Sequence, residues 1–179
     1  LALINYTSGT TGFSKGVMIP YRALWSNIDF GKKMLGATIK PGDNTISILP
    51  MAHMYGMAFE FLYEFMSGCH IFYLTRIPSP AIVAQAFADV KPCIIIAVPL
   101  IIEKIYRNAI LPKIKANPIM AKMYKSAIGR KMINTLVGKE MKKMFGGRMR
   151  FFGIGGAKLD GEVEKFLLEA KFPYAIGYG

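Results

Sequence analysis

Short, continuously apolar runs constrain the fold of this chain more than any other feature of its sequence. Residues 45–49 and 93–98 are two such runs, and they are followed by Pro50 and Pro99. The others are residues 71–74, residues 149–154 and the run that begins at Pro173. Runs of this length without polar alternation are typical of strands covered on both faces. The sequence therefore predicts buried strands rather than the half-exposed strands of a sandwich.

The stretches between these runs show helical spacing of their apolar residues. The predicted helices cover residues 21–35, 51–67, 81–90 and 100–109. Residues 51–67 are apolar nearly all round, apart from Glu60 and Glu64, which share one helical side, so we expect a buried helix there. Strands that alternate with helices predict an α/β fold, with a mainly parallel sheet flanked by helices.

Composition and chain ends limit the class of protein. A hydrophobic share of 53% excludes a disordered chain. No apolar run reaches the ~20 residues that a transmembrane helix needs, and the start lacks the pattern of a signal peptide. Cys69 and Cys93 lie in apolar surroundings, so we expect buried free thiols and a cytoplasmic protein. Because the sequence starts at Leu1 and stops at Gly179, within a predicted strand, we expect a piece of a larger protein.

Positive charge is concentrated in one segment. Residues 107–150 hold twelve Lys and Arg and a single acid, Glu140, whereas the rest of the chain holds eleven basic and ten acidic residues. Apolar residues recur in this segment at helical spacing, so it reads as a basic helical insertion. It is predicted to break into two or three helices at Pro112, Pro118, Gly129 and Gly138.

The basic insertion leaves three interpretations open. It can be a solvated helical face, or an amphipathic surface that docks on anionic lipid. It can also contact a partner subunit or bind nucleic acid, and nucleic acid is the least favoured of these partners.

One polar stretch has the composition of a phosphate-binding loop. Residues 6–17 read YTSGTTGFSKGV, between the apolar residues 1–4 and 17–19. Glycine lets backbone N–H groups turn toward an anion, hydroxyls donate hydrogen bonds, and the Lys15 ammonium stabilises negative charge. The stretch is not a Walker A loop, since Gly16 and a strand-like run follow the lysine. On composition alone, a mobile polar hairpin is the alternative.

The order of these residues closely resembles the phosphate loop of the adenylate-forming (AMP-binding) superfamily, which includes acyl-CoA synthetases, luciferases and peptide-synthetase adenylation domains. Ser14 stands where that family usually has proline. The resemblance assigns nucleotide and phosphate binding to Thr7, Ser8, Gly9, Thr10, Thr11, Gly12 and Lys15.

A second stretch, LPMAHMYG at residues 49–56, resembles a core motif of fatty acyl-CoA synthetases. The resemblance implies that His53 lies beside the reacting carboxylate, as a catalytic residue, and that Met54 and Met57 line the acyl pocket. A histidine just after a strand also lies where open α/β sheets place ligands. The alternative is a core histidine with satisfied hydrogen bonds. His70, which lies within a predicted strand and outside any motif, is expected to be structural.

Two later stretches resemble the same family in the same order. FFGIGGAKL, residues 151–159, is similar to the SGGAPL loop, although Ile154 and Lys158 replace its serine and proline. Residues 177–179, GYG, are similar to the first half of the GYGxTE motif. The resemblance assigns adenine and acyl-carboxylate binding to Gly155, Gly156, Ala157 and Tyr178.

The resemblance is strongest to long-chain fatty acyl-CoA synthetases, because these also carry a helical insertion at 107–148. It implies that residues 1–179 are part of one AMP-binding domain, with the phosphate-loop hairpin at 1–20 and the C-terminal domain absent. The metal-binding residues of the family follow Gly179, so no metal site is expected in this fragment, which we expect to be inactive alone. Fatty acid, ATP, Mg²⁺ and coenzyme A are the implied substrates and cofactors.

Several further expectations accompany this interpretation. We expect the protein to form a homodimer. We also expect it to be cytoplasmic, with peripheral contact to the inner face of an anionic membrane through residues 107–150. A luciferase-like enzyme or a fatty acyl-AMP ligase is the alternative within the superfamily. A non-catalytic module that binds lipid or nucleic acid through the basic helices is the alternative from another class.

Overall fold

A five-stranded parallel sheet forms the centre of the molecule, with the strand order β4-β3-β5-β6-β7. The computed structural model describes residues 1–7, 13–75 and 79–177. The strands are β3 (Asn44–Ser47), β4 (His70–Tyr73), β5 (Ile94–Ala97), β6 (Phe151–Ile154) and β7 (Tyr174–Ile176). Each lies within two residues of a run that the sequence predicts as a strand, so the predicted α/β fold is confirmed.

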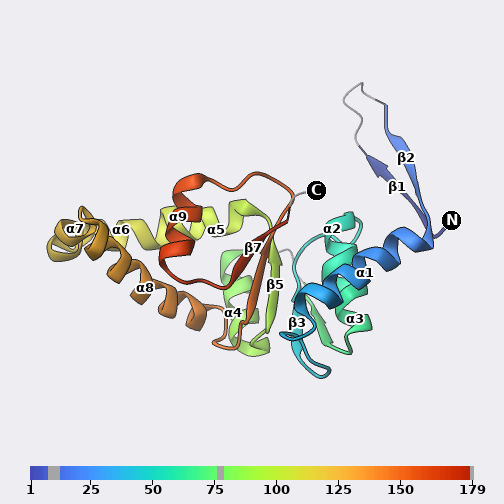
Figure 1. Cartoon of the computed structure of the whole chain (residues 1–179), viewed down its shortest axis with the longest axis horizontal. Helices are drawn as coiled ribbons and strands as arrows, with labels where there is room; N and C mark the ends of the chain where they lie inside the picture. Colours follow the sequence, from blue (N-terminus) through green and yellow to red (C-terminus); the bar gives the residue numbers. More distant parts are fainter. Residues whose placement is uncertain (8–12, 76–78, 178–179) are drawn as a thin grey trace.

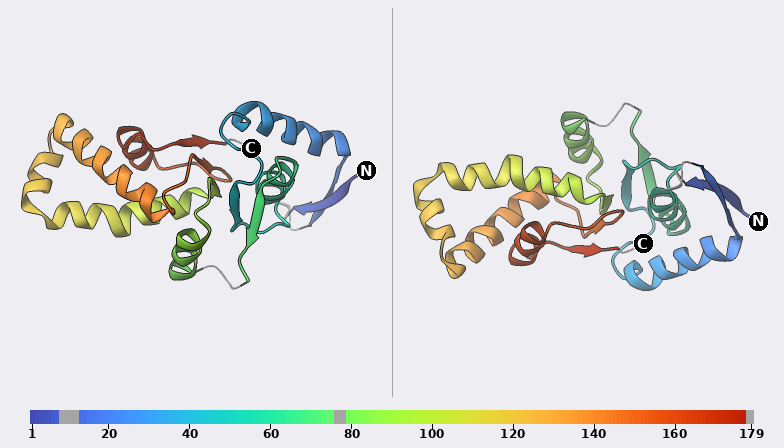
Figure 2. Two further views of the ribbon diagram at one scale, coloured as in Figure 1. Left: turned by 90° about the horizontal axis from the view of Figure 1, so that it is seen from below. Right: turned by 90° about the horizontal axis from the view of Figure 1, so that it is seen from above.

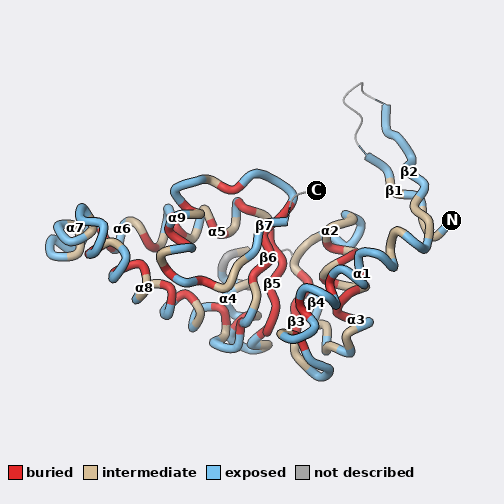
Figure 3. Tube along the Cα trace, in the orientation of Figure 1, coloured by how far each residue is buried: buried red, intermediate tan, exposed pale blue. Residues whose placement is uncertain are grey.

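The inner strands β5 and β6 are apolar because both faces of the sheet are covered there. The prediction of buried strands is wrong for the edge strands β4 and β7, which are largely exposed, and β3 also holds the buried polar residues Thr45 and Ser47. Successive side chains of a strand point to opposite faces. On β5, Ile95 and Ala97 join one buried cluster, whereas Ile94 and Ile96 join another. All four residues of β5 are at most 2% exposed. In Figure 3 the buried part of the chain follows these central strands, and exposure increases toward both ends of the molecule.

One face of the sheet is covered by α1 and by a helical segment that changes its hydrogen-bonding pattern. The elements are α1 (Tyr21–Leu35), α2 (Met54–Gly56), the π-helix η1 (Met57–Tyr63) and α3 (Glu64–Met66). Tyr63 is fully buried against Gly31 of α1, where an added Cβ would lie 3.0 Å from the tyrosine Cε2. The glycine therefore allows these two helices to approach closely.

The prediction of a buried helix at 51–67 is only partly right. Phe65 and Met66 are 64% and 39% exposed, whereas Glu60 and Glu64 are each 1% exposed. The segment is thus amphipathic, but its two acids point inward. For Glu60 the reason is a set of buried donors at the end of β3, described below.

The other face is covered by helices that come from three parts of the chain. They are α4 (Pro80–Val90), α5 (Pro99–Ile105), the π-helix η2 (Tyr106–Ile110) and α9 (Gly161–Glu169). A contact between Phe87 and Phe145, with ring centroids 5.3 Å apart, ties α4 to the end of the basic insertion. Figure 2 shows these helices on the side of the sheet away from α1.

The basic insertion is a helical hairpin that extends away from the sheet (Figure 1). It consists of α6 (Leu111–Ala116), α7 (Pro118–Tyr124) and α8 (Ala127–Met144). Pro118 starts a new helix as predicted, but Gly129 and Gly138 lie inside α8, so the predicted breaks at these glycines are wrong. Gly138 is buried against Ala170 and Gly129 against the Met123 backbone at the end of α7, so packing rather than helix ending accounts for both glycines. No helix of the described ranges is long and apolar enough to cross a membrane.

The N-terminal strands form a separate antiparallel hairpin that projects at the opposite end of the molecule (Figure 1). It pairs β1 (Leu3–Thr7) with β2 (Lys15–Ile19), and Thr7 lies opposite Lys15. The hairpin is tied to the body by the Asn5 side-chain amide, which donates a hydrogen bond of 3.3 Å to the Ala52 carbonyl oxygen. Ala52 immediately precedes His53, so the hairpin is anchored at the predicted site.

Candidate functional site

Three of the predicted motifs lie at the carboxyl edge of the sheet. The LPMAHMYG motif begins two residues beyond β3, Gly155 follows β6, and Gly177 follows β7. Strand β5 lies between β3 and β6 in the sheet. The chain order reverses between β3 and β5, because β4 lies on one side and the later strands on the other. Open parallel sheets bind ligands outside the carboxyl ends of their strands at such a point.

Tyr55 connects two of these motifs directly, although neither motif assigns it a role. An added Cβ at Gly155 would lie 2.7 Å from the Tyr55 Cζ, and one at Gly153 would lie 3.4 Å from its hydroxyl oxygen. Glycine at 155 is therefore required by a close approach to the ring. Burial raises the pKa of Tyr55 to about 12, so the phenol stays neutral and can donate a hydrogen bond.

His53 is exposed at the N-terminus of the helical segment that carries Tyr55. Its Nδ1 accepts a hydrogen bond of 3.2 Å from the Tyr55 backbone N–H. A ring nitrogen that accepts in this way carries no proton, so neutral His53 holds its proton on Nε2. The structure thus places one N–H donor at the carboxyl edge of the sheet, where the sequence predicts a catalytic histidine.

Glu60 is a further residue of the site that the motifs did not indicate. Its carboxylate accepts hydrogen bonds from the Ile48 N–H (3.1 Å), the Leu49 N–H (2.9 Å) and the Ser47 hydroxyl (3.0 Å). Burial raises its pKa to about 7, although these three donors oppose the shift. A signal for it existed in the sequence, since an acid in an otherwise apolar helix needs a buried partner.

The glycine loop after β6 exposes its backbone. The Gly155 N–H donates to the Ala97 carbonyl oxygen at 3.0 Å, which continues the sheet into the loop. Gly156 has a φ of 86°, in the left-handed region that favours glycine, and Gly156 and Ala157 are exposed. Ile154 is fully buried in the core, so this departure from the family pattern leaves the exposed backbone unchanged.

The phosphate loop is described only at its two ends. Ser8, Gly9, Thr10, Thr11 and Gly12 lie outside the described residues, whereas Thr7 and Lys15 are exposed and paired. Paired residues of an antiparallel ladder share a face, and so do residues two apart along a strand. Thr7 and Lys15 therefore lie on the same face of the hairpin as Asn5, which contacts the His53 loop.

The remaining predicted positions are Met54, Met57 and Tyr178. Met54 and Met57 are half-buried in the helical segment that starts at His53. Tyr178 lies outside the described residues, but the neighbouring Gly177 N–H donates to the Ile154 carbonyl oxygen at 2.7 Å. This bond places Gly177 at the same edge. Among the described residues, no group of three or more His, Cys, Asp and Glu side chains is suited to a metal ion.

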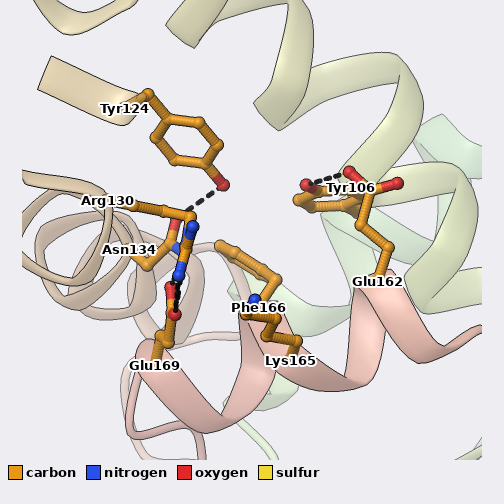
Figure 4. A pocket seen from close by; sticks show the side chains of 8 residues that line it. All are labelled: Tyr106, Tyr124, Arg130, Asn134, Glu162, Lys165, Phe166 and Glu169. Carbon is orange, nitrogen blue, oxygen red and sulfur yellow. Dashed lines mark hydrogen bonds and ion pairs between the residues drawn. The ribbon is translucent and has the colours of Figure 1, made fainter. Parts of the chain in front are cut away.

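A pocket of about 260 Å³ lies away from this edge, between η2, the insertion and α9 (Figure 4). Arg130 forms a two-pronged ion pair with Glu169, with a shortest distance of 2.9 Å. Asn134 donates to the same carboxylate at 2.8 Å and accepts from the Tyr124 hydroxyl at 3.0 Å. Because these polar groups satisfy one another, we interpret the pocket as the attachment of the insertion to α9.

Comparisons with known proteins agree with this arrangement. The profile of a family described as "AMP-binding enzyme" matches residues 1–179. Long-chain-fatty-acid–CoA ligase 4 of Saccharomyces cerevisiae is 29% identical over 99% of this chain, which corresponds to 27% of the yeast protein. Human long-chain-fatty-acid–CoA ligase 1 is 42% identical over 39% of this chain and 10% of its own length. Nearly the whole of this chain therefore matches about a quarter of the length of the yeast protein.

Solved structures share the fold. The adenylation domain of a carboxylate reductase from Mycobacterium chelonae has a TM-score of 0.69 and 24% identity, over 99% of this chain and 26% of that chain. ATP-bound MatB from Rhodopseudomonas palustris has a TM-score of 0.67 and 21% identity, over 98% of this chain and 28% of that chain. The motifs, their convergence on one sheet edge and the family match over the whole sequence lead to one conclusion: the chain belongs to the AMP-binding enzyme family.

Proposed function

We propose that this chain is the nucleotide-binding part of an ATP-dependent long-chain fatty acid–CoA ligase. The observation that carries the proposal is the convergence of the His53 motif and the Gly155–Gly156 loop on one sheet edge, linked by Tyr55. The anchoring of the hairpin beside His53 supports a triphosphate site there. Matches to long-chain-fatty-acid–CoA ligases favour an acid–thiol ligase over other activities in the family.

The chemistry assigned to this site is displacement at phosphorus, which requires positioning and charge neutralisation. Lys15 and the loop hydroxyls bind the β- and γ-phosphates of ATP. A carboxylate oxygen of the fatty acid attacks the α-phosphorus, the bond to the bridging oxygen breaks, and pyrophosphate leaves. The His53 Nε2–H donates to an acyl oxygen as charge develops there. The backbone of Gly155 to Ala157 and the ring of Tyr178 hold the adenine.

In the second step, the thiol of coenzyme A attacks the acyl carbon and AMP leaves. Mg²⁺ would accompany the triphosphate, and we assign it no ligand among the residues of this chain. Met54 and Met57 offer a soft apolar wall beside His53, which suits an alkyl chain.

Product analysis of the full-length protein tests the substrate. With ATP and coenzyme A, we expect palmitate to give palmitoyl-CoA and AMP faster than acetate or benzoate gives the corresponding thioester. Faster conversion of acetate or benzoate would contradict the long-chain assignment. Accumulation of palmitoyl-AMP without thioester would indicate a fatty acyl-AMP ligase instead. Binding of anionic vesicles with no response to ATP or to a palmitoyl-adenylate mimic would favour the non-catalytic module.

We further propose that the tip of the basic insertion docks on the anionic inner face of a membrane. Ile119 and Ile128 at the tip are 71% and 78% exposed, and Met132 is 57% exposed. Lys122 and Lys125 lie between them in the sequence, and no acid occurs from residue 104 to residue 139. Exposed aliphatic side chains surrounded by lysines suit the headgroup region of an anionic bilayer.

Co-sedimentation of the full-length protein with vesicles tests this docking. We expect binding to phosphatidylglycerol-containing vesicles that weakens with salt. Each lysine near an anionic surface contributes ~1 kcal/mol. The K122E/K125E variant should therefore bind at least about tenfold more weakly, and I119S/I128S should also lose affinity. L168S, which changes a side chain that is 63% exposed on α9, serves as the control. Equal binding to neutral vesicles, or unchanged binding by both tip variants, would contradict the proposal.

A further inference from the structure

Glu60 is a buried acid whose carboxylate accepts hydrogen bonds from the residues at the end of β3. It lies in η1 and is 1% exposed. No ion pair within the described ranges involves it, so only hydrogen bonds compensate its burial. Both carboxylate oxygens are used: Oε1 accepts from the Ile48 N–H, and Oε2 accepts from the Leu49 N–H and the Ser47 hydroxyl. A charge left without partners at this depth would be costly.

The donors that Glu60 binds have no partner in the sheet. The ladder between β3 and β4 ends at Ser47, opposite Tyr73, and β3 pairs with β5 only through Thr45 and Ile94. The N–H groups of residues 48 and 49 therefore lie beyond the last strand pair. A buried backbone donor without an acceptor is destabilising. The carboxylate supplies the missing acceptors, and it does so where the chain turns into the loop that carries His53.

The helical segment makes this contact part of the site. The segment 54–66 begins with His53 as its N-cap, carries the Tyr55 ring against Gly155, and carries Glu60 on the π-helix. Both ends of the loop 48–53 are thus held by this segment, one through Glu60 and the other through His53. π-Helical turns occur frequently at functional sites, since they change which side chains face inward.

We propose that Glu60 is the positioning residue of the His53 loop, which it holds at the carboxyl edge of the sheet through the backbone of residues 48 and 49. The expected effect of Glu60 on the reaction rate rests on the proposed function, whereas its expected effect on the backbone amides of residues 48 and 49 does not. The titratable groups that act on Glu60 or are influenced by it are Tyr55, Glu64 and Tyr73. All three have raised pKa values, so the ionisation nearest neutral pH in this cluster is that of Glu60 itself.

Glu64 provides a matched control. It lies one turn further along the same helical segment and is equally buried at 1% exposure. Its Oε2 has no hydrogen-bond partner among the described residues, and burial raises its pKa to about 9. A neutral acid is well imitated by glutamine, so E64Q should change little. In E60Q the amide nitrogen can no longer accept, so at least one donor of the His53 loop loses its acceptor.

The first test measures hydrogen exchange of the backbone amides of Ile48 and Leu49 in the full-length protein. We expect E60Q to accelerate hydrogen exchange at one or both of these amides at least about tenfold above the change in E64Q, because a hydrogen bond worth ~1.4 kcal/mol corresponds to tenfold. Equal protection in both variants would overturn the proposal. This measurement needs no catalysis, so it is independent of the proposed function.

The second test measures palmitate-dependent ATP–pyrophosphate exchange across pH. We expect E60Q to lower kcat at least about tenfold with little change in the KM for ATP, and E64Q to stay within about twofold of wild type. The wild-type rate should rise through pH 7 as Glu60 ionises, and this limb should be absent in E60Q. If the wild-type protein shows no palmitate-dependent ATP–pyrophosphate exchange, the proposed function is refuted. The hydrogen-exchange measurement would still test the structural role of Glu60.

If E60Q fails to fold, the S47A variant keeps the test decisive. It removes one donor that favours the ionised carboxylate, so the pH limb should move to higher pH. An unchanged limb in S47A, with an unchanged rate in the folded protein, would overturn the role of Glu60.

Discussion

At the scale of single residues, the site depends on contacts that bring two distant motifs together. Tyr55 belongs to the His53 motif, yet its ring lies against the backbone of Gly155, one hundred positions further along the chain. Gly155 is therefore required by the close approach of the ring rather than by its backbone conformation, since only Gly156 of the pair has a positive φ. A side chain at 155 must displace the ring or the loop.

The G155A variant tests this contact. An added Cβ would lie 2.7 Å from the Tyr55 Cζ, so we expect a loss of ~1–3 kcal/mol in the free energy of unfolding. The control is G161A, where an added Cβ meets nothing within 4 Å and should leave stability unchanged or slightly higher. Thermal or urea unfolding measures both. Equal stability of the two variants would show that Tyr55 does not occupy this position.

At the scale of elements, glycines inside α8 serve packing between helices. Gly138 faces the end of α9, where an added Cβ would lie 3.0 Å from the Ala170 Cβ and closer still to its carbonyl oxygen. The ion pair between Arg130 and Glu169 joins the same two helices. The insertion is thus fixed to the body near its base, while its tip remains exposed.

The G138A variant weighs two opposing effects. Replacing glycine by alanine inside a helix stabilises it by ~0.5–1 kcal/mol, whereas overpacking costs ~1–3 kcal/mol. We therefore expect net destabilisation in an unfolding experiment. The neighbouring K139A substitution, on the exposed side of α8, should be nearly neutral. A stabilised G138A protein would mean that α8 and α9 are further apart than described.

Sequence patterns predicted the elements well where one physical effect dominates. Apolar runs identified each described strand of the parallel sheet, because inner strands covered on both faces are mostly apolar. They did not predict the exposure of the edge strands β4 and β7. The same reasoning failed for Gly138, which packs against the distant Ala170, and for Gly129, which packs against Met123 at the end of α7. It also placed no role on Glu60 or Tyr55, because their partners at residues 47–49 and 155 are brought near only by the fold.

At the scale of the whole molecule, the central sheet separates two projections with different chemistry. The N-terminal hairpin carries the ends of the phosphate loop and is anchored beside His53. The basic helical hairpin extends from the opposite end (Figure 1). Most of the net charge of +12 lies in this second projection, so the net charge gives little information about the site.

Palmitate-dependent ATP–pyrophosphate exchange by the full-length protein, compared between H53A and H70A, tests the central claim most directly. His53 lies at the carboxyl edge of the sheet, whereas His70 starts β4 at the opposite edge. Removing one donor to a developing charge typically costs about a hundredfold in rate. We predict such a loss in H53A and a nearly unchanged rate in H70A. Equal rates in the two variants, or exchange that does not depend on fatty acid, would contradict the assignment of this edge as the site of acyl activation.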